Sequence, residues 1–273
     1  MSDTTICFIG GGNMATSLIG GLIASGRPAA DITVAEPEAG RRQALNERFG
    51  VHAVADNTAV AADAMVLAVK PQVLGAVCRQ IGPGLAERAP LFISIAAGIR
   101  VDSIARWLGF DAAIIRAMPN TPALLGCGAS GLFANRHVTS AQQDQGESIL
   151  RAVGLTQWVT EESQMDAVTA VSGSGPAYFL MLMEAMAEAG VDMGLPPATA
   201  RLLVMETAFG AAKMAMESDE TPAELRARVT SPGGTTEAAI RHFEEGGLRR
   251  LVGEALERAR ARAVTLADEQ GAD

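Results

Sequence analysis

A glycine-rich segment near the start of the chain has the spacing of a nucleotide-binding loop. Residues 8–15 read FIGGGNMA and contain a G-x-G-x-x-A pattern. In this pattern Gly10 permits a tight turn, Gly12 lets a pyrophosphate approach the backbone, and Ala15 allows close packing of a helix on a strand. The N–H groups at the start of that helix attract phosphate. The pattern therefore predicts a dinucleotide-binding loop, and the alternative is an ordinary tight turn.

One acidic residue has a spacing suited to the adenosine ribose of such a cofactor. Glu36 lies 24 residues after Gly12, close to the usual interval of about 20. Its carboxylate could accept both ribose hydroxyls, which would favour NADH and repel a 2′-phosphate. Arg41 and Arg42 could bind that phosphate instead, although they also fit an exposed basic helix face. The pattern leaves both NADPH and NADH open as cofactor.

Three further segments follow expected strands and combine small residues with prolines. They read AVKPQ at 68–72, AAG at 96–98 and MPNTP at 118–122. Such residues make rigid turns with close backbone approach, and any one segment could simply shape a turn. Ligands of doubly wound sheets bind beyond the carboxyl ends of the strands. Together with the glycine loop, the three segments are therefore expected to outline a cofactor cleft.

The second half of the chain contains two glycine-rich segments. SGSGPAY at 172–178 interrupts a helical pattern, where each interior glycine costs about 1 kcal/mol relative to alanine. Either close helix packing or a ligand must offset that cost, and we favour packing, within the chain or between subunits. SPGGTT at 231–236 combines flexible backbone and hydroxyls with the start of a helix, which suits a small carboxylate. A simple helix N-cap after a loop explains it equally well.

The elements that would position these segments differ between the two halves. In the first half, short apolar runs alternate with helical patterns, which predicts a parallel sheet with helices on both faces. Beyond about residue 166 only helical patterns occur, and Gly173 is expected to bend or break the first of them. We predict an α/β fold with residues 1–162 as a dinucleotide-binding domain and 163–273 as an all-helical domain. The expected strands are 5–9, 32–35, 51–54, 64–69, 91–95 and 113–118, and the expected helices include 13–25, 38–49, 165–189, 196–216, 235–245 and 248–269.

Composition narrows the classes of function. The net charge of −9 would repel a phosphate backbone, so we expect no nucleic-acid partner. No apolar run reaches the roughly 18 residues of a membrane helix, and the first residues, MSDTT, lack the basic segment of a signal peptide. Three scattered cysteines and three scattered histidines predict neither disulfides nor a metal site. A cytoplasmic location is expected.

The motifs in their order resemble those of the pyrroline-5-carboxylate reductase family, the last enzymes of proline synthesis. The resemblance covers nearly the whole chain. The most specific segments are DAVTAVSGSGPAYF at 166–179 and VTSPGGTT at 229–236, which join the loops at 8–15, 68–72 and 118–122. It implies a Rossmann-type doubly wound sheet followed by an all-helical C-terminal dimerisation domain. It also implies a homodimer that can assemble further, to decamers in many members.

The resemblance also implies roles for residues at matching positions. The substrate carboxylate would bind Ser231, Gly233, Gly234 and Thr235, with Glu162 also at the substrate pocket. Thr236 would act as the catalytic residue, its hydroxyl near the imine nitrogen. Many family members have small polar residues, and sometimes Arg, after the second strand, whereas this sequence has Glu36 there. This departure argues against the family's usual preference for NADPH. The implied cofactor site lies at the strand ends and comprises Ile9, Gly10, Gly11, Gly12, Asn13, Met14, Glu36, Asn57, Ala68, Val69, Lys70, Pro71, Ala96, Ala97, Gly98 and Asn120.

The implied reaction is hydride transfer from NAD(P)H to the cyclic imine carbon of pyrroline-5-carboxylate, which gives proline. Because the cofactor carries the chemistry, catalysis would consist largely of positioning. Two alternatives remain. One is another NAD(P)H-dependent imine or keto reductase of the same architecture, such as a β-hydroxyacid or deazaflavin-linked enzyme. The other is a non-catalytic dinucleotide-binding sensor.

Overall fold

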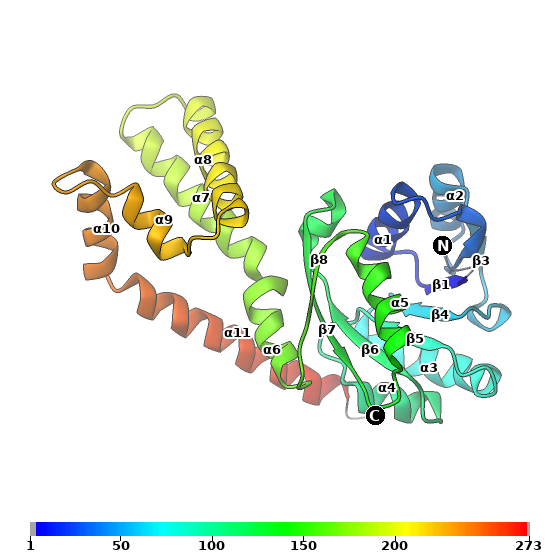
Figure 1. Ribbon diagram of the computed structural model, residues 1–273. Coiled ribbons are helices and arrows are strands. Elements are labelled where there is room, and N and C mark those ends of the chain that lie inside the picture. Colours follow the sequence, from blue (N-terminus) through cyan, green and yellow to red (C-terminus); the bar gives the residue numbers. More distant parts are fainter. Residues whose placement is uncertain (1–3, 272–273) are drawn as a thin grey trace. The chain divides into compact units, whose positions relative to one another are not determined.

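Eight strands form one sheet in the computed structural model of the chain, which describes residues 4–271. Their spatial order is β3-β2-β1-β4-β5-β6-β7-β8 (Figure 1). Strands β1 to β6 run parallel, and the order reverses between β1 and β4, which is the switch point of a doubly wound sheet. The first six strands are β1 Ile6–Ile9, β2 Ile32–Ala35, β3 His52–Val54, β4 Ala64–Leu67, β5 Leu91–Ser94 and β6 Ile114–Met118.

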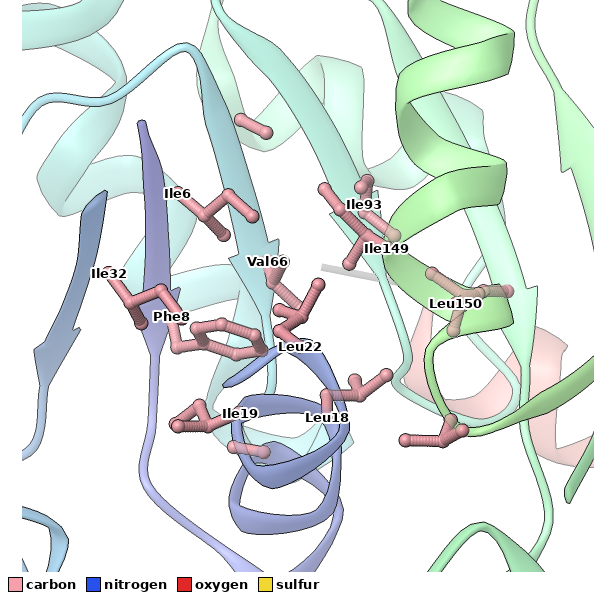
Figure 2. Packing of buried hydrophobic residues seen from close by; sticks show 14 of the residues in the cluster. Ile6, Phe8, Leu18, Ile19, Leu22, Ile32, Val66, Ile93, Ile149 and Leu150 are labelled. Carbon is pink, nitrogen blue, oxygen red and sulfur yellow. The ribbon is translucent and has the colours of Figure 1, made fainter. Parts of the chain in front are cut away.

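Helices cover both faces of this sheet, which explains why its central strands are continuous apolar runs. On one face Ile6 and Phe8 pack with Leu18 and Ile19 of α1 (Figure 2). Cys7 and Ile9 alternate with them and join the core of the opposite face. The first face is covered by α1 Asn13–Ala24, α2 Ala39–Phe49 and α5 Ser140–Arg151, and the second by α3 Pro71–Leu85 and α4 Val101–Leu108.

Two strands at one edge of the sheet escaped prediction. β7, Gly128–Ala134, runs antiparallel to β6, and β8, Gly154–Trp158, runs parallel to β7. Each begins with a glycine, a residue that weakens a strand pattern. The glycines allow close backbone approach, since a Cβ on Gly154 would lie 2.0 Å from the carbonyl oxygen of Gly128. This close contact requires glycine at both positions, and glycine makes the strands hard to recognise from the sequence.

The helical pattern that begins near residue 165 is broken as expected. α6, Gln164–Val168, passes into a π-helix, η4, at Thr169–Gly173, and α7 starts at Gly175 and ends at Asp192. Gly173 faces the sheet, because a Cβ there would lie 2.6 Å from Cε of Met118. Gly173 thus serves close packing within the chain, whereas a Cβ on Gly175 would have no atom within 4 Å. π-Helical turns are frequent at functional sites.

The chain divides into two compact units. One comprises Met1–Ser174 together with Arg258–Asp273, and the other is Gly175–Glu257. The second unit contains α7, α8 Pro197–Glu217, α9 Pro222–Arg228, α10 Thr235–Glu245 and the start of α11 Leu248–Gln270. The predicted α/β class, a Rossmann-type sheet followed by an all-helical region, is confirmed. The functional division into residues 1–162 and 163–273 stays a prediction.

The last turns of α11 belong to the first unit and pack on its sheet-covering elements. Ala263 and Ala267 are buried. The carbonyl oxygen of Gly271 accepts hydrogen bonds from Ser103 and Arg106 of α4. Arg100 forms an ion pair with Asp268 at 2.8 Å. The first unit is therefore assembled from two separate stretches of sequence. Within residues 4–271, no helix combines the length and apolar character needed to cross a membrane.

Candidate functional site

The topology places all of the expected cofactor loops at one edge of the sheet. Strands β1 to β6 run in the same direction, so their carboxyl ends lie together. The loop at 10–14 follows β1, Glu36 follows β2, and Asn57 follows β3 within a short 3₁₀ turn. The segments at 68–71, at 96–98 and at Asn120 follow β4, β5 and β6. Residues spread over 110 positions are thus brought to one edge.

The glycine loop has the backbone geometry that its pattern predicts. Gly10 has φ +99°, and a Cβ there would lie 2.8 Å from the carbonyl oxygen of Ala68, so this position requires glycine. By contrast, a Cβ on Gly12 would have no atom within 4 Å and would face open space. Gly12 is also the N-cap of α1, where no side chain caps the helix. This leaves room for an anionic group at the start of α1.

A pocket of about 480 Å³ opens beside this loop, between the start of α1 and one face of α2. Its lining contains three cationic side chains, Arg41, Arg48 and Lys70, and no Asp or Glu. In a protein with a net charge of −9, this is a local reversal of charge that attracts anions. The residues therefore fit the phosphates of a dinucleotide. The lining comprises Gly11, Gly12, Asn13, Thr16, Arg41, Ala44, Leu45, Arg48, Phe49 and Lys70.

Glu36 is held by the backbone and is almost fully buried, with 5% of its surface exposed. Its Oε2 accepts a hydrogen bond from the N–H of Gly11 at 2.8 Å, and its Oε1 accepts one from the N–H of Glu38 at 2.9 Å. The carboxylate thus ties the glycine loop to the start of α2. The neighbouring Arg42 donates to the carbonyl oxygens of Glu36 and Pro37, at 2.8 and 2.7 Å.

The loop at 96–98 is backed by the last turns of α11. Gly98 has φ +73°, and a Cβ on it would lie 3.5 Å from both Oε1 of Gln270 and Cβ of Leu266. Glycine relieves the strain of this backbone conformation. The loop is thus shaped by a helix that is remote in the sequence, a relation that no local pattern contains.

Asn120 joins the strand edge to the π-helix. Its side chain is largely buried, its Nδ2 donates to the carbonyl oxygen of Ser172 at 3.1 Å, and its Oδ1 accepts from the N–H of Ala129 at 2.9 Å. Both ends of the amide are therefore engaged by the backbone. Its expected place near the nicotinamide ring stays a prediction, and the structure adds a positioning role.

Glu162 belongs to a buried ionic network around Arg116. Oε1 of Glu162 accepts from Arg116 at 3.1 Å and from the N–H of Val101, at the start of α4, at 2.9 Å. Arg116 also lies 3.5 Å from Asp166 of α6, and its side chain is 5% exposed. The network links β6, α4 and α6. The expected contact of Glu162 with substrate stays a prediction, and an arginine inside the apolar run 113–118 was the available sequence signal for the network.

The expected substrate loop lies in the second unit. Gly233 has φ +70°, and its N–H donates to the carboxylate of Glu237 at 2.8 Å. Gly234 is the N-cap of α10, and Thr235 and Thr236 form the first turn, with Thr236 exposed. A carboxylate thus already sits on one backbone N–H of this loop. The expected binding of a substrate carboxylate at this loop stays a prediction.

The cysteines differ in environment. Burial raises the pKa of the Cys7 thiol and of the Cys78 thiol to about 12, whereas Cys127 is exposed. Both buried thiols lie in the apolar core and stay protonated at neutral pH. Across residues 4–271, no cluster of three or more His, Cys, Asp or Glu side chains is arranged to hold a metal ion.

The doubly wound sheet, the glycine loop at its switch point and the cationic pocket define a Rossmann-type dinucleotide-binding protein. Residues 5–98 match the family model described as NADP oxidoreductase, coenzyme F420-dependent. Residues 162–266 match the model described as pyrroline-5-carboxylate reductase dimerisation. The chain belongs to the pyrroline-5-carboxylate reductase family, and the resemblance seen in its motifs is confirmed.

The relatives match over essentially their whole length. The chain is 52% identical to a pyrroline-5-carboxylate reductase of Pseudomonas aeruginosa over 273 residues, covering 99% of this chain and 100% of the relative. A Coxiella burnetii pyrroline-5-carboxylate reductase structure superposes with a TM-score of 0.95 at 46% identity, covering 97% and 99% of the two chains. A Plasmodium falciparum pyrroline carboxylate reductase structure with NADP bound has a TM-score of 0.85 at 28% identity, covering 98% and 99%.

Proposed function

We propose that the protein reduces the C=N bond of 1-pyrroline-5-carboxylate with NADPH or NADH and so forms L-proline. The observation that carries this function is the 52% identity to a pyrroline-5-carboxylate reductase over the full length of both chains. The glycine loop and the VTSPGGTT segment lie inside that match. A structure of a relative with NADP bound supports NADP as the cofactor type.

The residues of the first unit would hold the cofactor at the sheet edge. Gly10 keeps the tight turn, and the open side of Gly12 admits the pyrophosphate against the start of α1. Lys70 supplies positive charge beside it, and Arg41 and Arg48 of α2 line the same pocket. Asn57 and the loops at 68–71 and 96–98 border the same edge. When bound, the nicotinamide supplies a hydride to the imine carbon, and the imine nitrogen gains a proton.

The residues of the second unit would hold the substrate. The N–H groups of Gly233, Gly234 and Thr235, with the hydroxyl of Ser231, would bind its carboxylate by charge-assisted hydrogen bonds. The carboxylate of Glu237 now bound to the N–H of Gly233 would give way to it. The hydroxyl of Thr236 would hydrogen-bond to the imine nitrogen and orient the ring. A hydroxyl is a weak acid, so we assign Thr236 this orienting contact and not the supply of the proton.

The match of residues 162–266 to a dimerisation model indicates a homo-oligomer. We propose a homodimer through α7 and α8, which can assemble further to a decamer, in the cytoplasm. Large apolar side chains stand exposed on these two helices, among them Phe179 at 67% and Phe209 at 65%. Faces of this kind in a single chain mark interaction surfaces. Light scattering on the purified protein measures the subunit number, and a monomer would contradict the assignment.

The decisive experiment follows cofactor oxidation at 340 nm after addition of pyrroline-5-carboxylate, with NADPH and NADH in parallel. We expect rapid oxidation of at least one cofactor and formation of proline. Thr236→Ala should lower kcat while the Kd of the cofactor stays unchanged, because Thr236 contacts substrate alone. Wild-type kcat in that variant would remove Thr236 from the mechanism. Cofactor binding without oxidation would favour another imine or keto reductase or a dinucleotide sensor.

A further inference from the structure

The acid at the end of β2 is not presented to a cofactor. Each oxygen of the Glu36 carboxylate accepts one backbone N–H, from Gly11 and from Glu38, and 5% of the residue is exposed. Leu45 closes the neighbouring side, because a Cβ on Gly11 would lie 2.7 Å from its Cδ1 and 3.3 Å from Oε2 of Glu36. A carboxylate that binds the ribose of NADH must be reachable by two hydroxyls. Each oxygen of Glu36 keeps a second acceptor site, but the residue is almost fully covered and does not line the pocket beside the glycine loop. The geometry instead gives Glu36 an internal role.

Exposed positive charge lies on the neighbouring helix instead. Arg41 and Arg48 of α2 line the pocket beside the glycine loop. Arg41 forms an ion pair with Glu38 at 2.9 Å, but both side chains are more than half exposed, so the pair is weak and can be exchanged. Arg48 stacks beside the ring of Phe49, with 4.8 Å from Cζ to the ring centroid, which leaves the edge of its guanidinium available.

We propose that Arg41 and Arg48 select NADPH by binding its 2′-phosphate, while Glu36 holds the glycine loop and does not discriminate between the two cofactors. The inference rests on the proposed function for the identity of the cofactor. A guanidinium matches a phosphate through two parallel N–H donors. Each oxygen of the Glu36 carboxylate faces a backbone N–H dipole, and the pocket that would receive the phosphate is lined by no Asp or Glu. NADPH is therefore accepted although an acid follows β2.

The first test measures the Kd of adenine nucleotides by isothermal titration calorimetry, so that its readout is independent of turnover. Wild-type protein should bind 2′,5′-ADP at least about tenfold more tightly than 5′-ADP, the ratio expected for one charge-assisted contact. The variants R41Q and R48Q should each shrink this ratio, with NADPH weakened and NADH unchanged. Raising the salt concentration should shrink it too. An unchanged ratio in the double variant R41Q/R48Q would overturn the proposal.

A matched control separates this site from general electrostatics. Arg151 of α5 is also exposed and also forms an ion pair with a glutamate, Glu147, but it lies outside the pocket. R151Q makes the same change in net charge and should leave both affinities unchanged. If R151Q lowers the ratio as much as R41Q does, the selection comes from overall charge and the proposal fails.

The variant E36Q tests the role of the buried acid. Its amide group must place an N–H₂ against one of the two backbone N–H donors, which loosens the glycine loop. We expect NADPH and NADH to weaken by the same factor, together with a lower Tm. A selective gain of NADPH over NADH would show that Glu36 reads the ribose, and would overturn the proposal.

The experiments also separate this inference from the proposed reaction. Protein that prefers 2′,5′-ADP through Arg41 and Arg48 but oxidises no cofactor with pyrroline-5-carboxylate would support the inference and contradict the reaction. Protein that reduces the imine but binds 2′,5′-ADP and 5′-ADP equally would do the reverse.

Discussion

Replacing Glu162 by alanine tests whether this residue stabilises the fold or binds substrate. The side chain of Arg116 is 5% exposed, and Glu162 is its closer anionic partner, at 3.1 Å compared with 3.5 Å for Asp166. Removing one partner of a buried ion pair costs about 3 to 5 kcal/mol. The N–H of Val101 loses its acceptor in the same variant. We therefore expect Tm to fall by roughly 6 to 20 °C, at about 2 to 4 °C per kcal/mol for a chain of this size.

The assay is differential scanning calorimetry at one fixed protein concentration, because subunit association also shifts Tm. Glu161→Ala is the matched control, since the neighbouring glutamate is exposed and should change the free energy of unfolding by less than about 0.5 kcal/mol. Glu162→Gln keeps an acceptor for Val101 and should recover part of the loss. A wild-type Tm in Glu162→Ala, combined with a raised KM for pyrroline-5-carboxylate, would refute the structural role and establish a substrate contact.

Three further predictions follow from the same structure. Gly12→Val should abolish cofactor binding at an unchanged Tm, because its side chain enters open space that we assign to the pyrophosphate; NADPH titration with wild-type affinity would contradict this assignment. Iodoacetamide at pH 8 should label one cysteine per native chain by mass spectrometry and leave Cys7 and Cys78 unlabelled, since burial raises their pKa to about 12; labelling of all three would contradict it. The pKa of Asp63 lies below its usual range, mainly because the backbone N–H of Thr5 donates to it. Asp63→Asn should therefore lower the free energy of unfolding at pH 7, measured by urea unfolding, and this loss should vanish as the pH falls through the folded pKa. A loss that is independent of pH would contradict the prediction.

The sequence predicts the central sheet well because burial on both faces imposes continuous apolar runs. Every expected strand of the first half is present, and the glycine loop lies where its pattern placed it. The edge strands β7 and β8 are missing from the prediction. They contain glycines, which weaken a strand pattern, and these glycines are required by close contacts with residues distant in the sequence. The break in the helical pattern at Gly173 was predictable, since interior glycines are costly, but its form as a π-helix was not.

The candidate site shows a sharper limit. Spacing places Glu36 after the second strand, but it carries no information about where the carboxylate points. The direction of the Glu36 carboxylate depends on two backbone N–H groups that only the folded loop brings within hydrogen-bonding distance. The same limit applies to Asn120 and Glu162. Asn120 donates to Ser172, which is 52 residues away in the sequence, and Glu162 pairs with Arg116, which is 46 residues away. Sequence motifs thus identify the loops that form a site, whereas the role of each side chain within it follows only from the folded structure.

The docking of the last turns of α11 has a consequence for how the protein is made. The first unit needs Arg258 onward to cover Gly98 and to supply the carbonyl group that Ser103 and Arg106 bind. A ribosome synthesises these residues after the whole second unit, so the nucleotide-binding part is completed only after the second unit has been made. In a nascent chain of residues 1–174, Gly98 and α4 would lack their contacts with the last turns of α11. Tags or truncations near the C-terminus would then disturb the N-terminal half, and a chain shortened before Arg258 should be sensitive to proteolysis at α4.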